Sequence, residues 1–402
     1  MKLYSTRTFF YKITAIFLIS CFILGSISFS SRAETSSPEQ DAPDVIVIMN
    51  ESFFDPSVLG NVPVNEDFLP FYHSLEEYTG KESNNLLKGT LHVSDVGGNS
   101  TNTEFEFLTG NSMAFLSPMR SPYSQYLNPD SEYIPALFRK SGYKTVSIYP
   151  YKNNSWNRNL AYSIMDFSES YFEDSFSSAQ RIRNYVSDTA VYEKALQLCE
   201  ETTQPIFIFC STIQNHSSYQ KIYSNFTPSV KASNTESNSL NQYLSLLKES
   251  DKALEYLIDR VSSSSRKTMV VFFGNHQPNN YLIEAMFHSD LSPDSSKTDS
   301  DIRYTVPYFI WANFDLTGYS MPDTSPSLLG NTVLEISDIK LNAFQEFLND
   351  FKTIIPAISS QGYMDQNGIF HPFTIHLERN TQNSEEFQYI NLYHDLVEES
   401  RS

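Results

Sequence analysis

The sequence predicts an α/β fold in which a mostly parallel central sheet is flanked by helices and followed by a small C-terminal subdomain. Short, continuous apolar runs recur along the chain, as expected of strands buried on both faces. They lie at 44–49, 145–149, 205–210, 268–273 and 306–311. Apolar residues with the 3.6-residue period of a helix lie at 188–198, 240–261, 341–351 and 385–399. Alternating strands and helices are typical of a parallel sheet covered on both faces.

Two local features refine this prediction. The fifth run contains Pro307, which predicts a strand start or an edge strand, because proline has no N–H to give to a ladder. The glycine-led segment 97–105 predicts a turn that enters a further helix. The helices of the last 80 or so residues either form a subdomain or pack back onto the sheet. The predicted regions are a targeting segment at 1–33, a polar linker at 34–43, the main α/β domain at 44–320 and a C-terminal subdomain at 321–402.

Composition and charge limit the classes of function that the chain can have. The chain has 402 residues, 40% hydrophobic and 19% charged, which is enough apolar material for a large core. The net charge is −19, and residues 1–33 hold basic but no acidic residues, so the rest of the chain is more acidic still. Nucleic acid is therefore excluded as an expected partner, because binding phosphate backbones requires a cationic face. A small phosphate-bearing substrate held by a metal in a local pocket is compatible with this charge.

The N-terminus predicts the compartment. Residues 13–29 are uncharged and mostly apolar, follow three basic residues and precede Ser31-Arg32-Ala33. This pattern is typical of a secretory signal peptide or an uncleaved signal anchor, and Leu18-Ile19-Ser20-Cys21 is an alternative lipid-attachment site. The positive flank keeps the N-terminus in the cytoplasm. We therefore expect the rest of the chain at the extracytoplasmic face of the cell membrane, or secreted if the segment is cleaved.

Two further cysteines, Cys199 and Cys210, fall near the ends of a predicted helix and a predicted strand. We interpret them as two buried free thiols, with a single disulfide as the alternative.

Polar residues follow the predicted strands at the points where the strands end. Asn50-Glu51-Ser52 follows the first run, Thr212 to His216 the third and Gly274 to Pro278 the fourth. Carboxyl ends of parallel strands meet at one edge of a sheet, so these side chains are expected to converge with the hydroxyls of the 97–105 turn. Oxygen and nitrogen donors without sulfur suit Mn²⁺, Mg²⁺ or Zn²⁺. A hydroxyl bound to such a metal becomes a nucleophile.

The motifs at these strand ends resemble those of a known family. They are Asn50-Glu51-Ser52-Phe53, GGNSTNTEFEFLTGNSM at 97–113, Trp156-Asn157-Arg158, Gln214-Asn215-His216 and Phe273-Gly274-Asn275-His276-Gln277-Pro278. In this order they look like the extracellular catalytic domain of lipoteichoic acid synthases and related phosphoglycerol transferases, in the sulfatase/alkaline phosphatase superfamily. The resemblance covers residues 44–315. The superfamily's sulfate-ester motif, a Cys or Ser followed by x-Pro-x-Arg, is absent from the nucleophile turn, which disfavours sulfate-ester hydrolysis.

The resemblance implies a set of site residues. One divalent metal, most often Mn²⁺, would be held by Glu51, the nucleophile Ser100 and His276, together with Asn275, where the family has an aspartate. Thr101 is the neighbouring alternative nucleophile. The substrate-binding residues would be Trp156, Arg158, His216 and Tyr149, the last replacing a histidine of the family, and His216 would also protonate a leaving group. Without the resemblance, Trp156 would be interpreted as a core aromatic and Arg158 as a surface charge.

The implied function is extracytoplasmic transfer of a phosphoglycerol group. A phosphatidylglycerol-like lipid would donate the group to Ser100, and a polymer or glycolipid of the cell envelope would accept it. Water as the acceptor would make the protein a phosphodiesterase. Asn275 and Tyr149 motivate a different hypothesis, a pseudoenzyme of the same fold that binds an envelope polymer or a partner protein.

Overall fold

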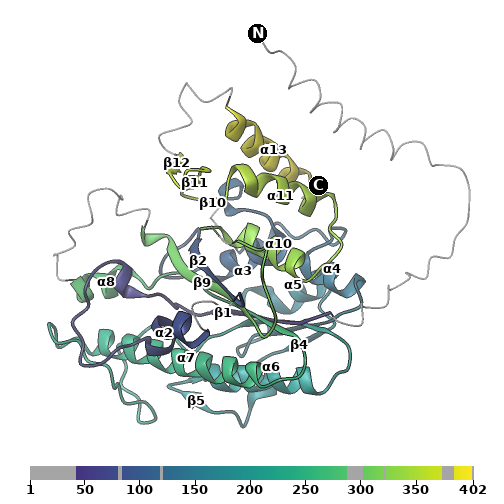
Figure 1. The fold of residues 1–402 in the computed structure, drawn as a ribbon. Helices are drawn as coiled ribbons and strands as arrows, with labels where there is room; N and C mark the ends of the chain where they lie inside the picture. Colours follow the sequence, from purple (N-terminus) through teal and green to yellow (C-terminus); the bar gives the residue numbers. More distant parts are fainter. Residues whose placement is uncertain are drawn as a thin grey trace, which may run out of the picture. The chain divides into compact units, whose positions relative to one another are not determined.

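The computed structural model describes residues 42–79, 84–117, 121–287, 302–320, 322–373 and 384–400 (Figure 1). The expected targeting segment, its alternative lipid-attachment site and most of the linker lie outside the described residues. Within the described residues, none of the helices combines the length and the apolar character that crossing a membrane requires.

A central sheet of seven strands has the order β2-β9-β8-β1-β7-β3-β4. Its strands are β1 (Asp44–Asn50), β2 (Leu86–His92), β3 (Lys144–Ile148), β4 (Glu169–Tyr171), β7 (Ile206–Ser211), β8 (Thr268–Gly274) and β9 (Thr305–Ala312). In the middle, β1 is parallel to both β7 and β8, with Val47 opposite Phe209 and Val271. Strand β9 is antiparallel to β8 and to β2. The prediction of a mostly parallel sheet is confirmed, and all five predicted strands are present.

Pro307 lies near the start of β9, as expected, but β9 is not an edge strand, because β2 pairs with its outer side. Opposite Pro307, the carbonyl oxygen of Thr90 accepts a hydrogen bond from the backbone N–H of Thr324 at 2.9 Å. The Thr90 carbonyl is therefore paired without an N–H from the proline. The edge alternative was wrong because β2 pairs with the outer side of β9. The sequence did not reveal β2 as a strand, because Leu86-Leu87-Lys88-Gly89-Thr90-Leu91-His92 is not a continuous apolar run.

Helices cover both faces of the sheet (Figure 1). One face carries α3 (Ser100–Thr109), α4 (Ile134–Lys140), α5 (Arg158–Ile164), α10 (Pro326–Ile336), α11 (Ala343–Ile354) and α13 (Glu385–Glu399). The other carries α2 (Pro70–Thr79), α6 (Asp188–Glu200), α7 (Asn238–Ser262) and α8 (Asn280–Phe287). The four helices predicted from periodicity correspond to α6, α7, α11 and α13.

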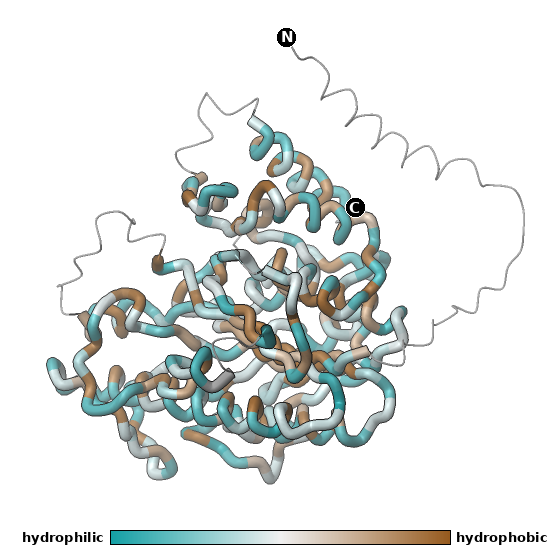
Figure 2. Tube along the Cα trace, viewed as in Figure 1, coloured by the Kyte–Doolittle hydropathy of each residue, from teal (hydrophilic) through white to brown (hydrophobic). Residues whose placement is uncertain are grey.

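Alternation along β1 divides the core into two parts. Val45, Val47 and Met49 face the cluster beneath α3, whereas Ile46 and Ile48 face the cluster beneath α6 and α7. All of β1 is buried, which explains its continuous apolar sequence. Apolar residues accordingly concentrate in the central strands and on the helix faces that meet them (Figure 2).

The C-terminal region packs against α3. It contains a three-stranded sheet, formed by β10 (Ala357–Ser359), β11 (Gly362–Met364) and β12 (Phe370–Pro372), and the helices α11 and α13. Tyr393 of α13 is fully buried, and its hydroxyl donates to the carbonyl oxygen of Gly110 at the end of α3. The C-terminal region therefore helps to hold the helix that begins at Ser100.

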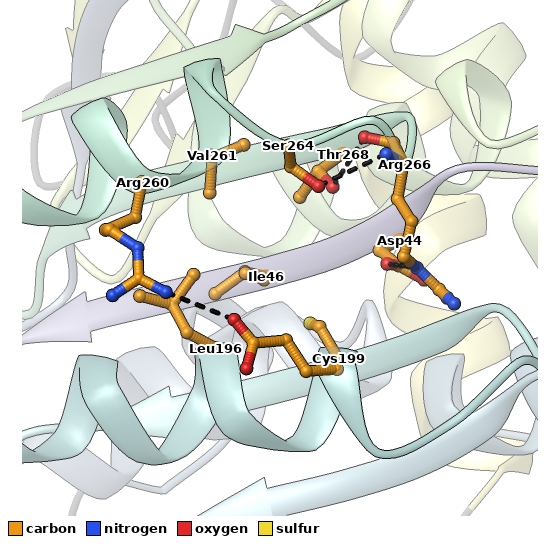
Figure 3. A pocket seen from close by; sticks show the side chains of 10 residues that line it. Asp44, Ile46, Leu196, Cys199, Arg260, Val261, Ser264, Arg266 and Thr268 are labelled. Atoms are coloured by element: carbon orange, nitrogen blue, oxygen red, sulfur yellow. Dashed lines mark hydrogen bonds and ion pairs between the residues drawn. The ribbon is translucent and has the colours of Figure 1, made fainter.

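Cys199 and Cys210 are buried free thiols, as predicted. Cys199 lines a small cavity of about 50 Å³ between α6 and α7, beside the first residues of β1 and β8 (Figure 3). Arg266 closes one side of this cavity through a bidentate pair with Asp44, in which Nε and Nη2 each lie 2.6 Å from a carboxylate oxygen. The cavity lies at the amino ends of the strands, whereas the predicted chemistry lies at their carboxyl ends.

A buried carboxyl on α3 gives the first prediction. Glu106 is fully buried, and its Oε1 accepts hydrogen bonds from Ser94 Oγ at 3.0 Å and the Met113 backbone N–H at 2.8 Å. Burial raises the pKa of Glu106 to about 8 from an ordinary value of 4.5. Between these pH values the folded chain binds more protons than the unfolded chain, so the Glu106 contribution to stability falls as pH rises through this window. Glu106→Gln removes that loss.

We therefore expect the Tm of Glu106→Gln minus that of the wild type to increase from pH 5 to pH 9, because only the wild type must bury a charge at high pH. Thermal unfolding followed by circular dichroism at each pH measures this difference. A Tm difference that is constant with pH would contradict the raised pKa.

Candidate active site

Four of the predicted site residues meet at the carboxyl ends of β1 and β8. Glu51 directly follows β1, and Asn275 and His276 directly follow β8. Ser100 is the first residue of α3. Glu51, Asn275 and His276 are all buried, with at most 5% of their surface exposed. The structure therefore brings together the side chains that the sequence places on three separate segments.

The contacts among these residues are direct. Ser100 Oγ donates a hydrogen bond to Glu51 Oε2 at 3.0 Å and lies 3.4 Å from His276 Nε2. The same Nε2 lies 3.6 Å from Glu51 Oε1. Of the hydroxyls in the 97–105 turn, Ser100 contacts the carboxylate, whereas Ser52 Oγ, from the segment after β1, donates to Glu51 Oε1 at 3.2 Å. The structure therefore gives Ser100, and not the alternative Thr101, the contacts expected of the nucleophile.

A tight turn delivers Ser100 to this position. Gly97 has a φ of +74°, and its backbone N–H donates to the carbonyl oxygen of Gln277 at 2.9 Å, which ties the turn to the segment after β8. A Cβ on Gly97 would lie 3.0 Å from Asn279 Cα. Asp95 accepts hydrogen bonds from the side chains of Asn99 and Asn102 at 2.9 and 2.7 Å. Ser100 therefore lies at a helix N-terminus, where backbone N–H groups stabilise negative charge.

A second close approach positions Asn275. A Cβ on Gly274 would lie only 2.0 Å from the carbonyl oxygen of Phe53, so only glycine lets these two strand ends meet. Asn275 Oδ1 then accepts a hydrogen bond from the backbone N–H of Ser52 at 2.8 Å. Thr103 Oγ1 donates to the Asn275 carbonyl oxygen at 2.7 Å. The asparagine is held from both sides.

The surroundings of Glu51 favour its ionised form. Burial alone raises the pKa of its carboxyl, but the charges of His276 and His216 and hydrogen bonds from Asn275 and Ser100 outweigh burial and lower the pKa. His276 Nδ1 lies 2.9 Å from the carbonyl oxygen of Gln277. Because a carbonyl only accepts, Nδ1 carries a hydrogen, and Nε2 is the nitrogen that faces Ser100 and Glu51. Protonated, this nitrogen carries the charge that favours ionised Glu51, and when deprotonated it could offer its lone pair to a metal.

Three of these donors fit a divalent metal. Ligands bound tetrahedrally at about 2.1 Å lie about 3.4 Å apart. The distances from Ser100 Oγ to Glu51 Oε2 and to His276 Nε2, 3.0 and 3.4 Å, are close to that spacing. Within the described residues, no group of three or more His, Cys, Asp or Glu side chains is placed to hold a metal ion. A metal here would therefore depend on the Ser100 hydroxyl in addition to Glu51 and His276.

Asn275 does not complete this donor set in the orientation shown. Its Nδ2 donates to Glu51 Oε2 at 2.7 Å, so an amide nitrogen faces the carboxylate. The Ser52 N–H fixes this orientation, because it needs an oxygen acceptor on the other side of the amide. An amide nitrogen carries no free lone pair for a metal, so Asn275 would have to turn to contribute an oxygen.

Glu51→Gln is expected to lower the affinity for Mn²⁺ at least tenfold and to leave the fold intact, because it removes the sole carboxylate of the donor set while keeping its shape. Calorimetric titration of the purified protein with Mn²⁺ measures this affinity, and circular dichroism checks the fold. Unchanged affinity would remove Glu51 from the site.

Arg158 is buried in an ion pair with Glu104 and is not a surface charge. It is 1% exposed, and its Nε and Nη2 form a fork on Glu104 of α3, with Nη2 lying 2.7 Å from Oε2. The Tyr149 ring lies over the guanidinium, 3.9 Å from Cζ to the ring centroid. Its interpretation as a surface charge is therefore wrong, and so is the interpretation of Trp156 as a core aromatic, because Trp156 is 52% exposed.

His216 lies at the surface of the site. Its Nδ1 is 2.7 Å from the Ser217 carbonyl oxygen, which leaves Nε2 as the nitrogen available for chemistry. Arg183 Nη2 donates to the His216 carbonyl oxygen at 2.7 Å, and the Tyr185 ring lies against the imidazole. A positive charge on His216 lowers the pKa of Glu51, so the two residues are linked electrostatically.

A buried polar network beneath the site escaped the sequence analysis. Asp188, at the start of α6, accepts hydrogen bonds from Asn50 Nδ2 at 2.8 Å and from Ser250 Oγ at 2.6 Å. Asn215 Nδ2 donates to the same Ser250 Oγ at 2.9 Å. Burial raises the pKa of Asp188 to about 6. The network connects Asn50, which precedes Glu51, to Asn215, which precedes His216. These residues lie far apart in the sequence, and no motif there indicates that they are connected.

The sequence is similar to that of a known protein family and of known proteins. The sequence model of the family described as Sulfatase matches residues 43–339. The chain is 29% identical over 300 residues to a Rhizobium meliloti protein named "Putative cyclic beta-1,2-glucan modification protein". That match covers 73% of this chain and 45% of the relative, so the chain spans less than half of the relative's length.

Two solved structures share the fold. The phosphoglycerol transferase GacH of Streptococcus pyogenes, solved with sn-glycerol-1-phosphate, is similar with a TM-score of 0.68 and 21% identity, over 91% of this chain and 87% of that chain. The lipoteichoic acid synthase LtaP of Listeria monocytogenes is similar with a TM-score of 0.63 and 18% identity, over 90% of this chain and 92% of that chain. These similarities confirm the predicted alkaline phosphatase-like fold.

Proposed function

This chain belongs to the sulfatase family, in the sulfatase/alkaline phosphatase superfamily, and we propose that it is an extracytoplasmic phosphoglycerol transferase that acts through a covalent intermediate on Ser100. The observation that carries this proposal is the placement of the Ser100 hydroxyl at a helix N-terminus, 3.0 Å from an ionised, buried carboxylate. That arrangement suits a nucleophile attacking an anionic phosphodiester.

The first step forms a bond from Ser100 Oγ to phosphorus and breaks the bond from phosphorus to the lipid oxygen. Glu51 Oε2 accepts the hydrogen bond from Ser100 and takes its proton as the bond from Oγ to phosphorus forms. Protonated His216 gives its Nε2 hydrogen to the departing diacylglycerol oxygen, and glycerol phosphate stays on Ser100. Glu51, Ser100 and His276 would hold a divalent metal, with Mn²⁺ the expected ion, and its positive charge would lower the pKa of the Ser100 hydroxyl.

The second step reverses these roles. The neutral Nε2 of His216 takes a proton from an acceptor hydroxyl, whose oxygen then attacks phosphorus. The bond from phosphorus to Ser100 Oγ breaks, and Ser100 recovers its proton from Glu51. We propose a carbohydrate hydroxyl of an envelope polymer or glycolipid as the acceptor, since the Rhizobium meliloti relative is named for glucan modification. The N-terminal segment would tether the site at the membrane that contains the lipid donor.

The test is release of diacylglycerol from phosphatidylglycerol by purified protein with Mn²⁺. Release together with glycerol phosphate on an added glucan or glycolipid supports the transferase. Release of diacylglycerol and free glycerol phosphate without any acceptor product would indicate the phosphodiesterase. The pseudoenzyme hypothesis, which Asn275 favours by facing Glu51 with its nitrogen, predicts no diacylglycerol at all.

A further inference from the structure

Glu104 lies on the same face of α3 as Ser100. The two residues are four positions apart, which places them about 6 Å apart along the helix axis and on the same side. Ser100 Oγ faces the carboxylate of Glu51, and Glu104 faces the guanidinium of Arg158. One turn of α3 therefore joins the candidate nucleophile to the ion pair.

One guanidinium nitrogen of Arg158, Nη1, takes no part in the ion pair. Glu104 is fully buried, and its carboxylate accepts bonds from Arg158 Nε at 3.1 Å, from Nη2 at 2.7 Å and from the Tyr162 hydroxyl at 2.6 Å. Arg158 Nη1 is also buried but has no hydrogen-bond partner. A buried N–H without an acceptor is unfavourable, and such groups in native proteins call for an explanation.

We propose that Glu104 is a positioning residue, which holds the Arg158 guanidinium one helical turn from Ser100 so that Nη1 binds an oxygen of the substrate phosphate. This inference rests on the proposed function, because it assumes a phosphate group on Ser100 or approaching it. The fork on Glu104 fixes the plane of the guanidinium, and the Tyr149 ring restricts its movement out of that plane. Orientation fixed in advance favours binding, since the side chain has no freedom left to lose.

The test is Glu104→Asp, which keeps the charge of the pair and withdraws the carboxylate by about 1.5 Å, the length of one C–C bond. A misplacement of that size at a substrate-orienting group costs up to about 100-fold in rate. We expect the Kd for glycerol phosphate, measured by calorimetry with the full protein and Mn²⁺, to rise at least tenfold. The kcat/KM for phosphatidylglycerol should fall by a similar factor.

Tyr162→Phe is the matched control. It removes a hydrogen bond to the same carboxylate but leaves the fork of Arg158 on Glu104 in place. It should lower the Tm while leaving the Kd for glycerol phosphate within about twofold of the wild type. If Tyr162→Phe weakens glycerol phosphate binding as much as Glu104→Asp does, Glu104 has only a structural role and the inference is overturned.

Arg158→Lys provides a second variant that keeps the buried pair but has a single nitrogen, which Glu104 occupies. We expect it to fold and to bind glycerol phosphate at least tenfold more weakly, which also decides the matter if Glu104→Asp does not fold. Wild-type affinity in Arg158→Lys would overturn the inference. The binding assay needs no turnover, so weakened binding in a protein that releases no diacylglycerol would support the positioning role while rejecting the transferase.

Discussion

Ser100→Ala is expected to abolish diacylglycerol release and the covalent phosphoryl adduct together. The Ser100 hydroxyl is the one that reaches Glu51 and His276, and removing the nucleophile of a covalent mechanism lowers turnover by roughly 10⁴- to 10⁶-fold. Mass spectrometry after incubation with phosphatidylglycerol should find the adduct on the wild-type peptide that contains Ser100 and none in the variant. Calorimetry should also show weaker Mn²⁺ binding, because the hydroxyl is one of three fitting donors.

Two variants provide controls for this experiment. Thr101→Ala should keep the adduct and the turnover, because Thr101 is buried and has no part in the contacts with Glu51. Ser100→Thr should retain activity, because threonine keeps the hydroxyl at the same position. An adduct on Thr101, or full activity in Ser100→Ala, would show that the nucleophile has been misassigned.

The fold was predictable to the extent that burial leaves a mark on local sequence. Strands β1, β7 and β8 are buried on both faces and are therefore continuous apolar runs. Strand β2 is only half-buried over most of its length, and β4 has three residues, so neither produces such a run. The position of Pro307 depended on β2 and Thr324, which are distant in sequence, and could not be derived from β9 alone.

The site was predictable where the chemistry follows a strand end. Glu51 and His276 each come directly after a buried strand, and the topology of a parallel sheet brings these positions together. The setting of Arg158 was not predictable, because its partner Glu104 lies on another helix, within a phenylalanine-rich segment that reads as core. The sequence does hold one clue, since Glu104 follows Ser100 by one helical turn and is, like Glu106, a carboxyl residue among the apolar side chains of a buried helix.

Asn275→Asp is expected to increase the affinity for Mn²⁺ at least tenfold, which corresponds to about 1.4 kcal/mol. In the wild type, Asn275 Nδ2 donates to Glu51 Oε2 at 2.7 Å and satisfies the carboxylate without a metal. Aspartate would keep the acceptor for the Ser52 N–H and place a second carboxylate oxygen against Glu51. Two carboxylates at that distance repel, so the metal-free variant should be less stable than the wild type, and Mn²⁺ should restore its Tm.

Activity of the same variant separates the two functional hypotheses. If metal occupancy limits a working enzyme, Asn275→Asp should release diacylglycerol at lower Mn²⁺ concentrations than the wild type does. Asn280→Asp adds the same charge to an exposed asparagine nearby and should change neither the Mn²⁺ affinity nor the concentration dependence. If instead the chain is a scaffold for binding an envelope polymer, Asn275→Asp gains metal affinity without activity. Absence of diacylglycerol release from both the wild type and Asn275→Asp at saturating Mn²⁺ would therefore reject the transferase, because a restored ligand set would have been shown to bind metal and still perform no chemistry.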